Sequence, residues 1–248
     1  MKIINFFTKL FRFISHITNT KKIISDIGEF NICASENQSE KIRLWFEKIS
    51  KIIGIKIKIK GQIKSGNYLI ISNHSSWLDI IILGSTFKTT FLSKIEVSSW
   101  PIIGRITRAV DMLFIDRGKK NAASVAGDGI SRFLSNNRNV TIFPEGTSSG
   151  GKKLLKFKPR LFASCIDTNS PVQCVIIRYP HKDKNIHPSV PFVRGNSLFL
   201  NILKVLFQDD IAAEITISEL VFTDNKDRRS ISNECYKIIK KNLEQNAN

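Results

Sequence analysis

NYLIISNHSSWLDIIILGSTF, residues 67–87, indicates a strand, a loop and a helix in direct succession. The apolar run at 68–71 is short and is typical of a buried strand. A longer apolar run follows Ser76 and Asp79, and these two residues have the spacing of a helix capping box. Strand, loop and helix in this order form the repeating unit of α/β proteins. The stretch therefore predicts an α/β fold.

The rest of the chain repeats this alternation of short apolar runs and helical patterns. We expect further strands at 55–61, 89–94, 111–117, 139–146, 171–179 and 214–222, and helices at 39–54, 97–110, 120–137 and 227–248. In the first of these strands Ile55, Ile57 and Ile59 would face a core, and the intervening lysines would face solvent. The alternation predicts a mostly parallel sheet that helices cover.

Residues 1–22 combine a phenylalanine-rich apolar face with basic side chains at helical spacing. Such a helix either lies on a membrane or docks on the protein's own core, and the basic flanks favour the membrane. Lys9 and Arg12 interrupt the apolar residues, which argues against a signal peptide, and no apolar run is long enough to span a membrane. We expect residues 1–50 to form membrane-associating helices and residues 51–248 to form an α/β domain.

The chain has 38 Lys and Arg against 21 Asp and Glu, which gives a formal net charge of +17. A surplus of this size indicates a polyanionic partner, such as nucleic acid, an anionic membrane or an acidic carrier protein. The sequence shows no aromatic RNA-binding motif, zinc finger or clear helix-turn-helix, so we expect no nucleic-acid partner. The four cysteines form no Cys-x-x-Cys pair, and we expect no metal site.

His74 and Asp79 are candidates for a catalytic pair on either side of the expected helix start. On one continuous helix, side chains five residues apart point roughly 140° away from each other and could not meet. They can meet if His74 lies in the loop and Ser75 or Ser76 is the N-cap. Asp79 would then accept the Nδ1 proton of His74 and leave Nε2 as a general base. The alternative is an ordinary loop histidine beside a capping aspartate.

A second polar loop lies within VTIFPEGTSSGG, residues 140–151. Glycine and threonine at the carboxyl end of a strand expose backbone N–H groups that suit an oxyanion or a phosphate. The loop also contains GTSSG, which matches the nucleophile elbow of α/β hydrolases with Ser148 as nucleophile. That motif needs a helix directly after the serine, whereas GGKKLLKFKPR follows here. A hydrolase that uses Ser148 with His181 or His187 stays an open alternative.

Arg117 lies at the carboxyl end of the strand expected at 111–117, where α/β proteins bind their ligands. An arginine there can bind a phosphate through two parallel hydrogen bonds. The alternative is a surface arginine paired with Asp116.

Four stretches, in one order, resemble the motifs of the glycerolipid acyltransferase family, the group of the bacterial 1-acylglycerol-3-phosphate acyltransferases. They are NHSSWLD (73–79), MLFIDRG (112–118), FPEGTSS (143–149) and SPVQCVII (170–177). The segments SKIEVSSWPIIGR (93–105) and FKPRLF (157–162) are similar to the family's connecting segments. The resemblance covers roughly residues 50–220 and implies an α/β core with an N-terminal two-helix element on the membrane.

The resemblance implies a role for each matching residue. His74 would deprotonate an acceptor hydroxyl, and Asp79 would orient and stabilise the imidazole. The alkoxide would attack the thioester of an acyl-CoA or an acyl carrier protein, with no acyl-enzyme intermediate and no cofactor. The residues that would help to bind the substrates are Arg117, Glu145, Gly146, Thr147, Lys94 and Pro171.

One position departs from the family pattern, because Ser148 replaces an arginine that is thought to bind the acceptor phosphate. Losing one charge-assisted contact costs ~1.5–3 kcal/mol, unless Lys94, Lys152 or Lys153 replaces it. We expect 1-acylglycerol-3-phosphate as the acceptor, with another lysolipid such as lyso-ornithine lipid as the alternative. The resemblance implies phospholipid biosynthesis by a peripheral membrane protein on the cytoplasmic face of the inner membrane.

Overall fold

The computed structural model describes residues 2–20, 36–100, 104, 107, 110, 112–116, 118–182 and 186–245. Arg117 and half of the helix expected at 97–110 lie outside these residues. The strands are β1 (Lys56–Lys60), β2 (Leu69–Ser72), β3 (Thr89–Lys94), β4 (Leu113–Ile115), β5 (Asn139–Ile142), β6 (Val172–Arg178) and β7 (Ala212–Val221). The helices are α1 (Lys2–Thr18), α3 (Glu36–Ile53), α4 (Leu78–Thr86), α5 (Ile95–Ser98), α7 (Ala122–Ser135), α8 (Ala163–Asp167), α9 (Leu198–Leu206) and α10 (Arg228–Gln245), and a 3-10 turn, η1, spans Pro159–Phe162.

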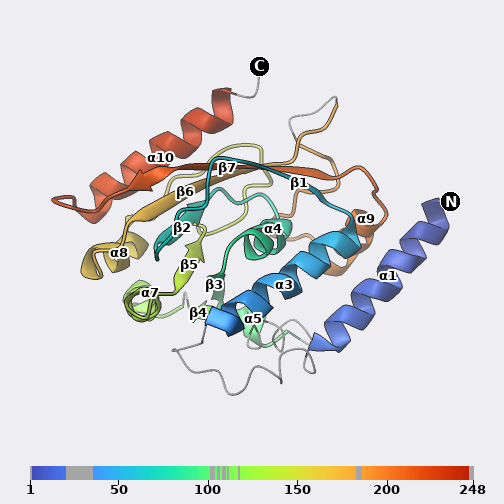
Figure 1. The fold of residues 1–248 in the computed structure, drawn as a ribbon, viewed down its shortest axis with the longest axis horizontal. Coiled ribbons are helices and arrows are strands. Elements are labelled where there is room, and N and C mark those ends of the chain that lie inside the picture. Colours follow the sequence, from blue (N-terminus) through green and yellow to red (C-terminus); the bar gives the residue numbers. More distant parts are fainter. Residues whose placement is uncertain are drawn as a thin grey trace.

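The strands form one seven-stranded sheet in the order β1-β7-β6-β2-β5-β3-β4 (Figure 1). All neighbouring strands are parallel except β6 and β7, which are antiparallel. The predicted α/β fold with a mostly parallel, helix-covered sheet is therefore confirmed. The departure is confined to one side, where β7 and β1 run against the other strands.

Helices cover both faces of the sheet and create two apolar cores (Figure 1). Neighbouring side chains of β2 enter different cores: Ile70 packs with α3, α4 and α9, whereas Leu69 and Ile71 pack with α7, α8 and α10. A strand that is buried on both faces needs apolar residues at every position, which explains the unbroken apolar run of β2. Because β2, β5, β3 and β4 are parallel neighbours, the loops that follow them meet at one edge of the sheet.

The edge strand β1 differs from its predicted burial. Ile55, just before the strand, is buried and Ile57 is half-buried, but Ile59 is 46% exposed. The expectation that all three isoleucines face a core is therefore wrong at Ile59. Among the residues that the structure describes, β1 pairs with β7 alone, so it is an edge strand of the sheet.

Helix α1 has two apolar faces rather than one. Its core-facing side chains pack against the rest of the protein and are Phe6, Leu10, Phe13 and Ile17. Its outward side chains are 52–75% exposed and are Ile3, Ile4, Phe7, Phe11 and Ile14. Docking on the core therefore occurs, and it leaves a second apolar face, which we call the α1 outward face, in contact with solvent.

Helix α3 differs from α1, because its large apolar side chains Trp45 and Phe46 are buried in the same core as Ile70, which we call the main core. One hydrogen bond and one ring contact join α1 to its neighbours. Lys9 Nζ donates to Asp209 Oδ1 at 2.8 Å, and the ring of His16 stacks on Trp45. Within the described ranges, none of the helices is long and apolar enough to cross a bilayer.

Candidate active site

The site lies where the chain leaves β2 at the carboxyl edge of the sheet. β2 ends at Ser72, and the Asn73 side chain then bridges to β6, since it accepts from Ile177 N–H and donates to Ile177 O, both at 2.9 Å. These two bonds extend the pairing with β6 by one residue while the main chain turns away from the sheet. His74 is the next residue, so it lies in a loop that is held at its base.

The His74 and Asp79 side chains meet across the loop and the first turn of α4. Nδ1 of His74 lies 2.8 Å from Asp79 Oδ2, and the Asp79 side chain is fully buried while that of His74 is 17% exposed. A carboxylate that accepts from Nδ1 fixes the tautomer with an unprotonated Nε2, and it stabilises an imidazolium. The pair therefore has the geometry of an oriented general base.

The same carboxylate also holds the backbone just before helix α4. Asp79 Oδ2 accepts from the backbone N–H of Ser75 at 2.6 Å and of Ser76 at 2.9 Å, the two residues before the N-cap. The cap position itself falls at Trp77, one residue later than predicted, and its side chain makes no capping bond. One carboxylate thus holds the chain at the entrance to α4 and orients the imidazole, and the two interpretations of the stretch do not compete.

The loop after β5 holds both the backbone and the ring of His74. The His74 N–H donates to Glu145 Oε1 at 2.7 Å, and its carbonyl accepts from the N–H of Ser149 at 2.8 Å and from its hydroxyl at 3.1 Å. The His74 ring stacks on Phe143, with 4.0 Å between the ring centroids. The stretches 73–79 and 143–149 therefore form one structural unit around the imidazole.

Glu145 is buried, and both of its carboxylate oxygens accept backbone hydrogen bonds. The donors are His74 N–H at 2.7 Å and Leu155 N–H at 2.9 Å. Burial raises the pKa of Glu145 to about 7, although the two backbone hydrogen bonds act to lower that pKa. This position favours a role in holding the catalytic loop over the predicted direct contact with an acceptor head group.

Tyr179 is a residue of the site that sequence reasoning missed. Its hydroxyl donates to Asp79 Oδ1 at 2.6 Å, across 100 residues of sequence, and the side chain is buried. Burial and the adjacent Asp79 carboxylate raise the pKa of the Tyr179 phenol, so it stays protonated and donates. The available sequence signal is its place directly after β6, at the same edge of the sheet as His74.

The turn at 144–147 brings a lysine close to a left-handed glycine. Gly146 has a φ of 75°, which favours glycine, and Thr147 beside it is exposed. A Cβ at position 146 would lie 2.6 Å from Lys158 Nζ, so the ammonium group lies against the turn. The sequence pointed to Lys94, Lys152 or Lys153 for this charge, whereas the lysine that lies against Gly146 is Lys158.

The remaining predicted substrate ligands lie at different distances from the pair. Lys94 ends β3 at the same edge of the sheet as His74, two strands away, or about 10 Å. Pro171 precedes β6, and Val172 pairs with Leu69 at the start of β2, so Pro171 lies at the opposite edge. A contact of Pro171 with an acyl chain stays a prediction, as does the contact of Arg117, which lies outside the described residues.

Ser148 does not occupy a nucleophile elbow. Residues 149–158 form turns and irregular backbone, and the next regular element is η1, which begins at Pro159. An elbow requires a strand, a sharp turn and a helix in direct succession. The local geometry therefore contradicts the hydrolase alternative.

A second cluster of titratable groups lies near α9. Ligand atoms of His181, His187 and Asp210 lie within 4.8 Å of one another. The Ser189 N–H donates to His187 Nδ1 at 3.2 Å, so His187 Nε2 carries the proton and donates to Asp210 Oδ1 at 3.2 Å. These bonds hold the loop at 186–190 against the start of β7. Both ring nitrogens of His187 therefore have hydrogen-bond partners within the protein. The expected absence of a metal stays a prediction.

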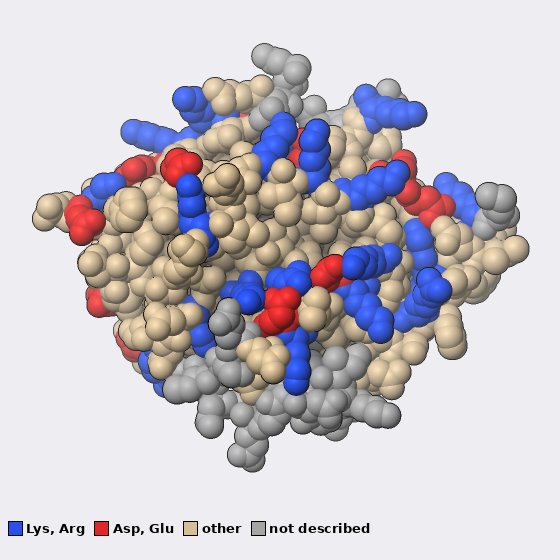
Figure 2. Space-filling model, viewed as in Figure 1, with Lys and Arg blue, Asp and Glu red and all other residues tan. Residues whose placement is uncertain are grey.

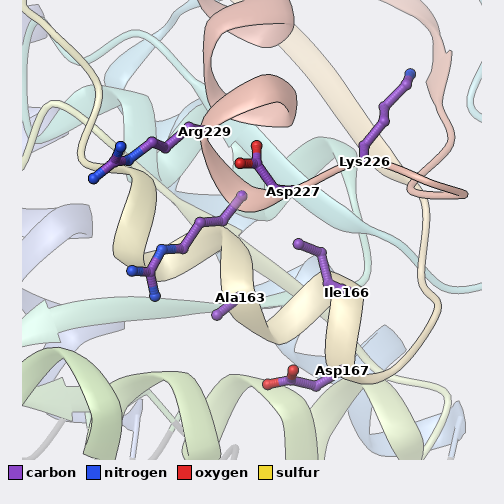
Figure 3. A pocket seen from close by; sticks show the side chains of 7 residues that line it. Ala163, Ile166, Asp167, Lys226, Asp227 and Arg229 are labelled. Atoms are coloured by element: carbon purple, nitrogen blue, oxygen red, sulfur yellow. The ribbon is translucent and has the colours of Figure 1, made fainter.

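A surface hollow of about 440 Å³ lies between α8 and the start of α10 (Figure 3). Its lining residues are Ala163, Ile166, Asp167, Lys226, Asp227, Arg228 and Arg229. They flank the pair of Val172 and Val221, which lies at the edge of the sheet opposite His74. This hollow is therefore separate from the catalytic pair.

Comparison with known proteins agrees with the geometry. A model of the acyltransferase family matches residues 54–178. The lyso-ornithine lipid O-acyltransferase of Pseudomonas aeruginosa is 29% identical over 198 residues, which cover 80% of this chain and 76% of that protein. The 1-acyl-sn-glycerol-3-phosphate acyltransferase of Neisseria gonorrhoeae is 32% identical over 127 residues, which cover 51% of this chain and 50% of that protein.

The fold is similar to a crystal structure of the 1-acyl-sn-glycerophosphate (LPA) acyltransferase PlsC from Thermotoga maritima. The TM-score is 0.71 at 17% identity, and the match covers 99% of this chain and 97% of the other. The family match spans half of the chain and includes His74, Asp79 and the stretch 143–149. The chain therefore belongs to the acyltransferase family and is an acyl-transferring enzyme.

Proposed function

We propose that this acyltransferase moves a fatty acyl group from a thioester donor, acyl-CoA or an acyl carrier protein, to the hydroxyl of a lysolipid. The observation that supports this most directly is the 2.8 Å contact between His74 Nδ1 and Asp79 Oδ2. It supplies a general base, and the irregular backbone after Ser148 argues against a serine nucleophile. The first candidate acceptor is 1-acylglycerol-3-phosphate, and the second is lyso-ornithine lipid.

The reaction needs one base and no covalent enzyme intermediate. His74 Nε2 takes the proton of the acceptor hydroxyl as its oxygen attacks the thioester carbonyl. The tetrahedral intermediate then collapses, the C–S bond breaks, and the departing thiolate takes the proton back from the imidazolium. Asp79 is fully buried and stabilises the imidazolium while that charge exists. No cofactor takes part in this scheme.

The choice of acceptor depends on the charge near the turn at 144–147. Ser148 stands where a phosphate-binding arginine is expected, and Lys158 Nζ lies against Gly146. Lys158 is thus the candidate to bind an acceptor phosphate, together with Arg117. An acceptor without a phosphate has less need of the missing arginine. Of the two relatives compared above, the one matched over the larger share of its length is named as an acyltransferase for lyso-ornithine lipid.

The surface suits an anionic membrane. Basic side chains outnumber acidic ones over the face in Figure 2, in keeping with the net charge of +17. The α1 outward face adds exposed Phe7 and Phe11, and amphipathic helices of this kind bind at the lipid–water interface. We place the enzyme as a peripheral protein at the cytoplasmic face of the inner membrane, in phospholipid biosynthesis.

The test is thiol release by the purified full chain, with acyl-CoA or acyl-loaded carrier protein, across a panel of lysolipids. Lys158→Ala should raise the KM for 1-acylglycerol-3-phosphate by about ten- to a hundredfold, because a charge-assisted contact contributes about 1.5–3 kcal/mol. Lys156→Ala, an exposed neighbouring lysine, is the matched control and should leave that KM unchanged. Wild-type enzyme that acylates none of the lysolipids in the panel would contradict the proposal.

A further inference from the structure

Helix α9 presents an apolar stripe to solvent that the sequence did not reveal. Phe199 is 67% exposed and Leu200 is 64% exposed, and Phe207, just past the helix, is 40% exposed. At 3.6 residues per turn these positions share one face with the half-buried Leu203. The opposite side of the helix, which includes Val205, is buried in the main core. The outward stripe is therefore not needed to attach α9 to the protein.

This stripe reaches helix α1 at Phe207. The rings of Phe6 and Phe207 lie 5.6 Å apart, and Lys2 Nζ lies 5.4 Å from the Phe207 ring centroid. Figure 1 shows α9 beside the amino end of α1. Phe6 belongs to the core-facing side of α1, and its ring lies 5.3 Å from that of Phe7 on the α1 outward face. The α9 stripe and the α1 outward face therefore adjoin through these rings.

The α9 stripe is also linked to the catalytic loop. Trp77 Nε1 donates to Asn201 Oδ1 at 2.7 Å, which joins the N-cap residue of α4 to the buried side of α9. Just before α9, Phe192 N–H donates to Ser75 O at 3.1 Å, next to His74. A surface that fixes the position of α9 therefore fixes the position of the loop that holds His74.

Charge around the stripe matches a lipid headgroup layer. Exposed Arg194 and Lys204 flank it, with Lys2 at its far end. Two acidic residues nearby are already paired, Asp209 with Lys9 and Asp210 with His187. Apolar side chains with a basic rim are the composition of interfacial helices.

We propose that α9 is a second membrane-inserting element, whose residues Phe199, Leu200 and Phe207 enter the same anionic leaflet as α1. Contact at two places fixes the tilt of the protein as well as its attachment, and it holds the catalytic loop at the depth of the lipid headgroups. A lysolipid can then reach His74 without leaving the leaflet. This inference rests on the proposed function for its acceptor, and its test is independent of catalysis.

The test is sedimentation of the full chain with sucrose-loaded vesicles of phosphatidylcholine and phosphatidylglycerol. Phe199→Ser with Leu200→Ser should lower the partition coefficient about tenfold or more, since each side chain transfers a large apolar area. The matched control is Val125→Ser with Phe222→Ser, which removes two side chains of similar exposure, 55% and 59%, away from α1 and α9. The control should bind as the wild type does.

Phe199→Trp with Leu200→Phe should keep or strengthen binding, and thermal unfolding verifies that each variant is folded. Equal partition of the serine variant and the wild type would overturn the proposal, as would a wild type that does not sediment with vesicles. Unchanged vesicle binding with lost self-association would assign the stripe to a second copy of the chain instead. Failure of the proposed function is seen separately, as a wild type that binds vesicles but acylates no lysolipid.

Discussion

At the level of single side chains, the geometry around Asp79 explains how the imidazole is held. The carboxylate accepts from His74 Nδ1, from the backbone of Ser75 and Ser76, and from the Tyr179 hydroxyl. Those bonds compensate for the burial of its charge, which would otherwise be costly. The spacing of His74 and Asp79 is visible in the sequence. The contact of Tyr179 with Asp79 is not, because the two residues are 100 positions apart in the chain.

Tyr179→Phe tests whether this phenol positions the pair. The variant removes the donor that lies 2.6 Å from Asp79 Oδ1. We expect kcat to fall by about ten- to a hundredfold with KM unchanged, because a hydrogen bond to a charged group contributes about 1.5–3 kcal/mol. Tyr68→Phe is the matched control, since that buried hydroxyl donates to Lys64 O at 3.2 Å, away from the pair. Equal kcat values for the two variants would rule out the positioning role.

Glu145 predicts a pH dependence of stability. Its pKa is raised by burial to about 7, so the folded state retains a proton that the unfolded chain releases near pH 4.5. The stabilisation from this group is complete below about pH 4.5 and is lost as pH rises through about 7, by on the order of 3 kcal/mol. Urea unfolding of wild type and Glu145→Gln at both ends of this range isolates the effect. Parallel pH dependences would refute this assignment.

At the level of the elements, most strands and helices follow from periodicity and short apolar runs. β2, β3, β6 and α4 lie where the sequence predicts them. Helix α9 was not predicted, since it follows a loop of mixed residues. The reversed direction of β7 was not predicted either, because it depends on long-range pairing. Burial at the end of β1 was overestimated, because sequence alternation does not tell an edge strand from a covered one.

The two faces of α1 should respond differently to substitution. Phe7→Ser with Phe11→Ser removes side chains that are 61% and 75% exposed, so the free energy of unfolding should change by less than about 0.5 kcal/mol while vesicle binding falls. Phe6→Ser with Leu10→Ser removes core-facing contacts and should accelerate amide hydrogen exchange throughout α1. The same exchange pattern in both variants would mean that α1 does not have two distinct faces.

At the level of the whole molecule, the fold places the loops after β2, β5 and β3 at one edge of the sheet. The hydrogen bond between Trp77 and Asn201 links helix α9 to that edge. The sequence predicted the motifs, and it placed Arg117 and the turn at 144–147 at the carboxyl ends of strands. It could not predict that Lys158 reaches Gly146 or that Glu145 is buried, because both depend on the path of the loop at 149–158.

The assignment of acyl transfer to His74 is tested most directly by two substitutions, measured as thiol release from acyl-CoA in the presence of an accepted lysolipid. His74→Ala should lower kcat by about 10²–10⁴-fold, the usual contribution of a general base, while the protein stays folded. Ser148→Ala should keep kcat close to the wild-type value. Full activity in His74→Ala together with loss of activity in Ser148→Ala would contradict the account and favour a serine nucleophile.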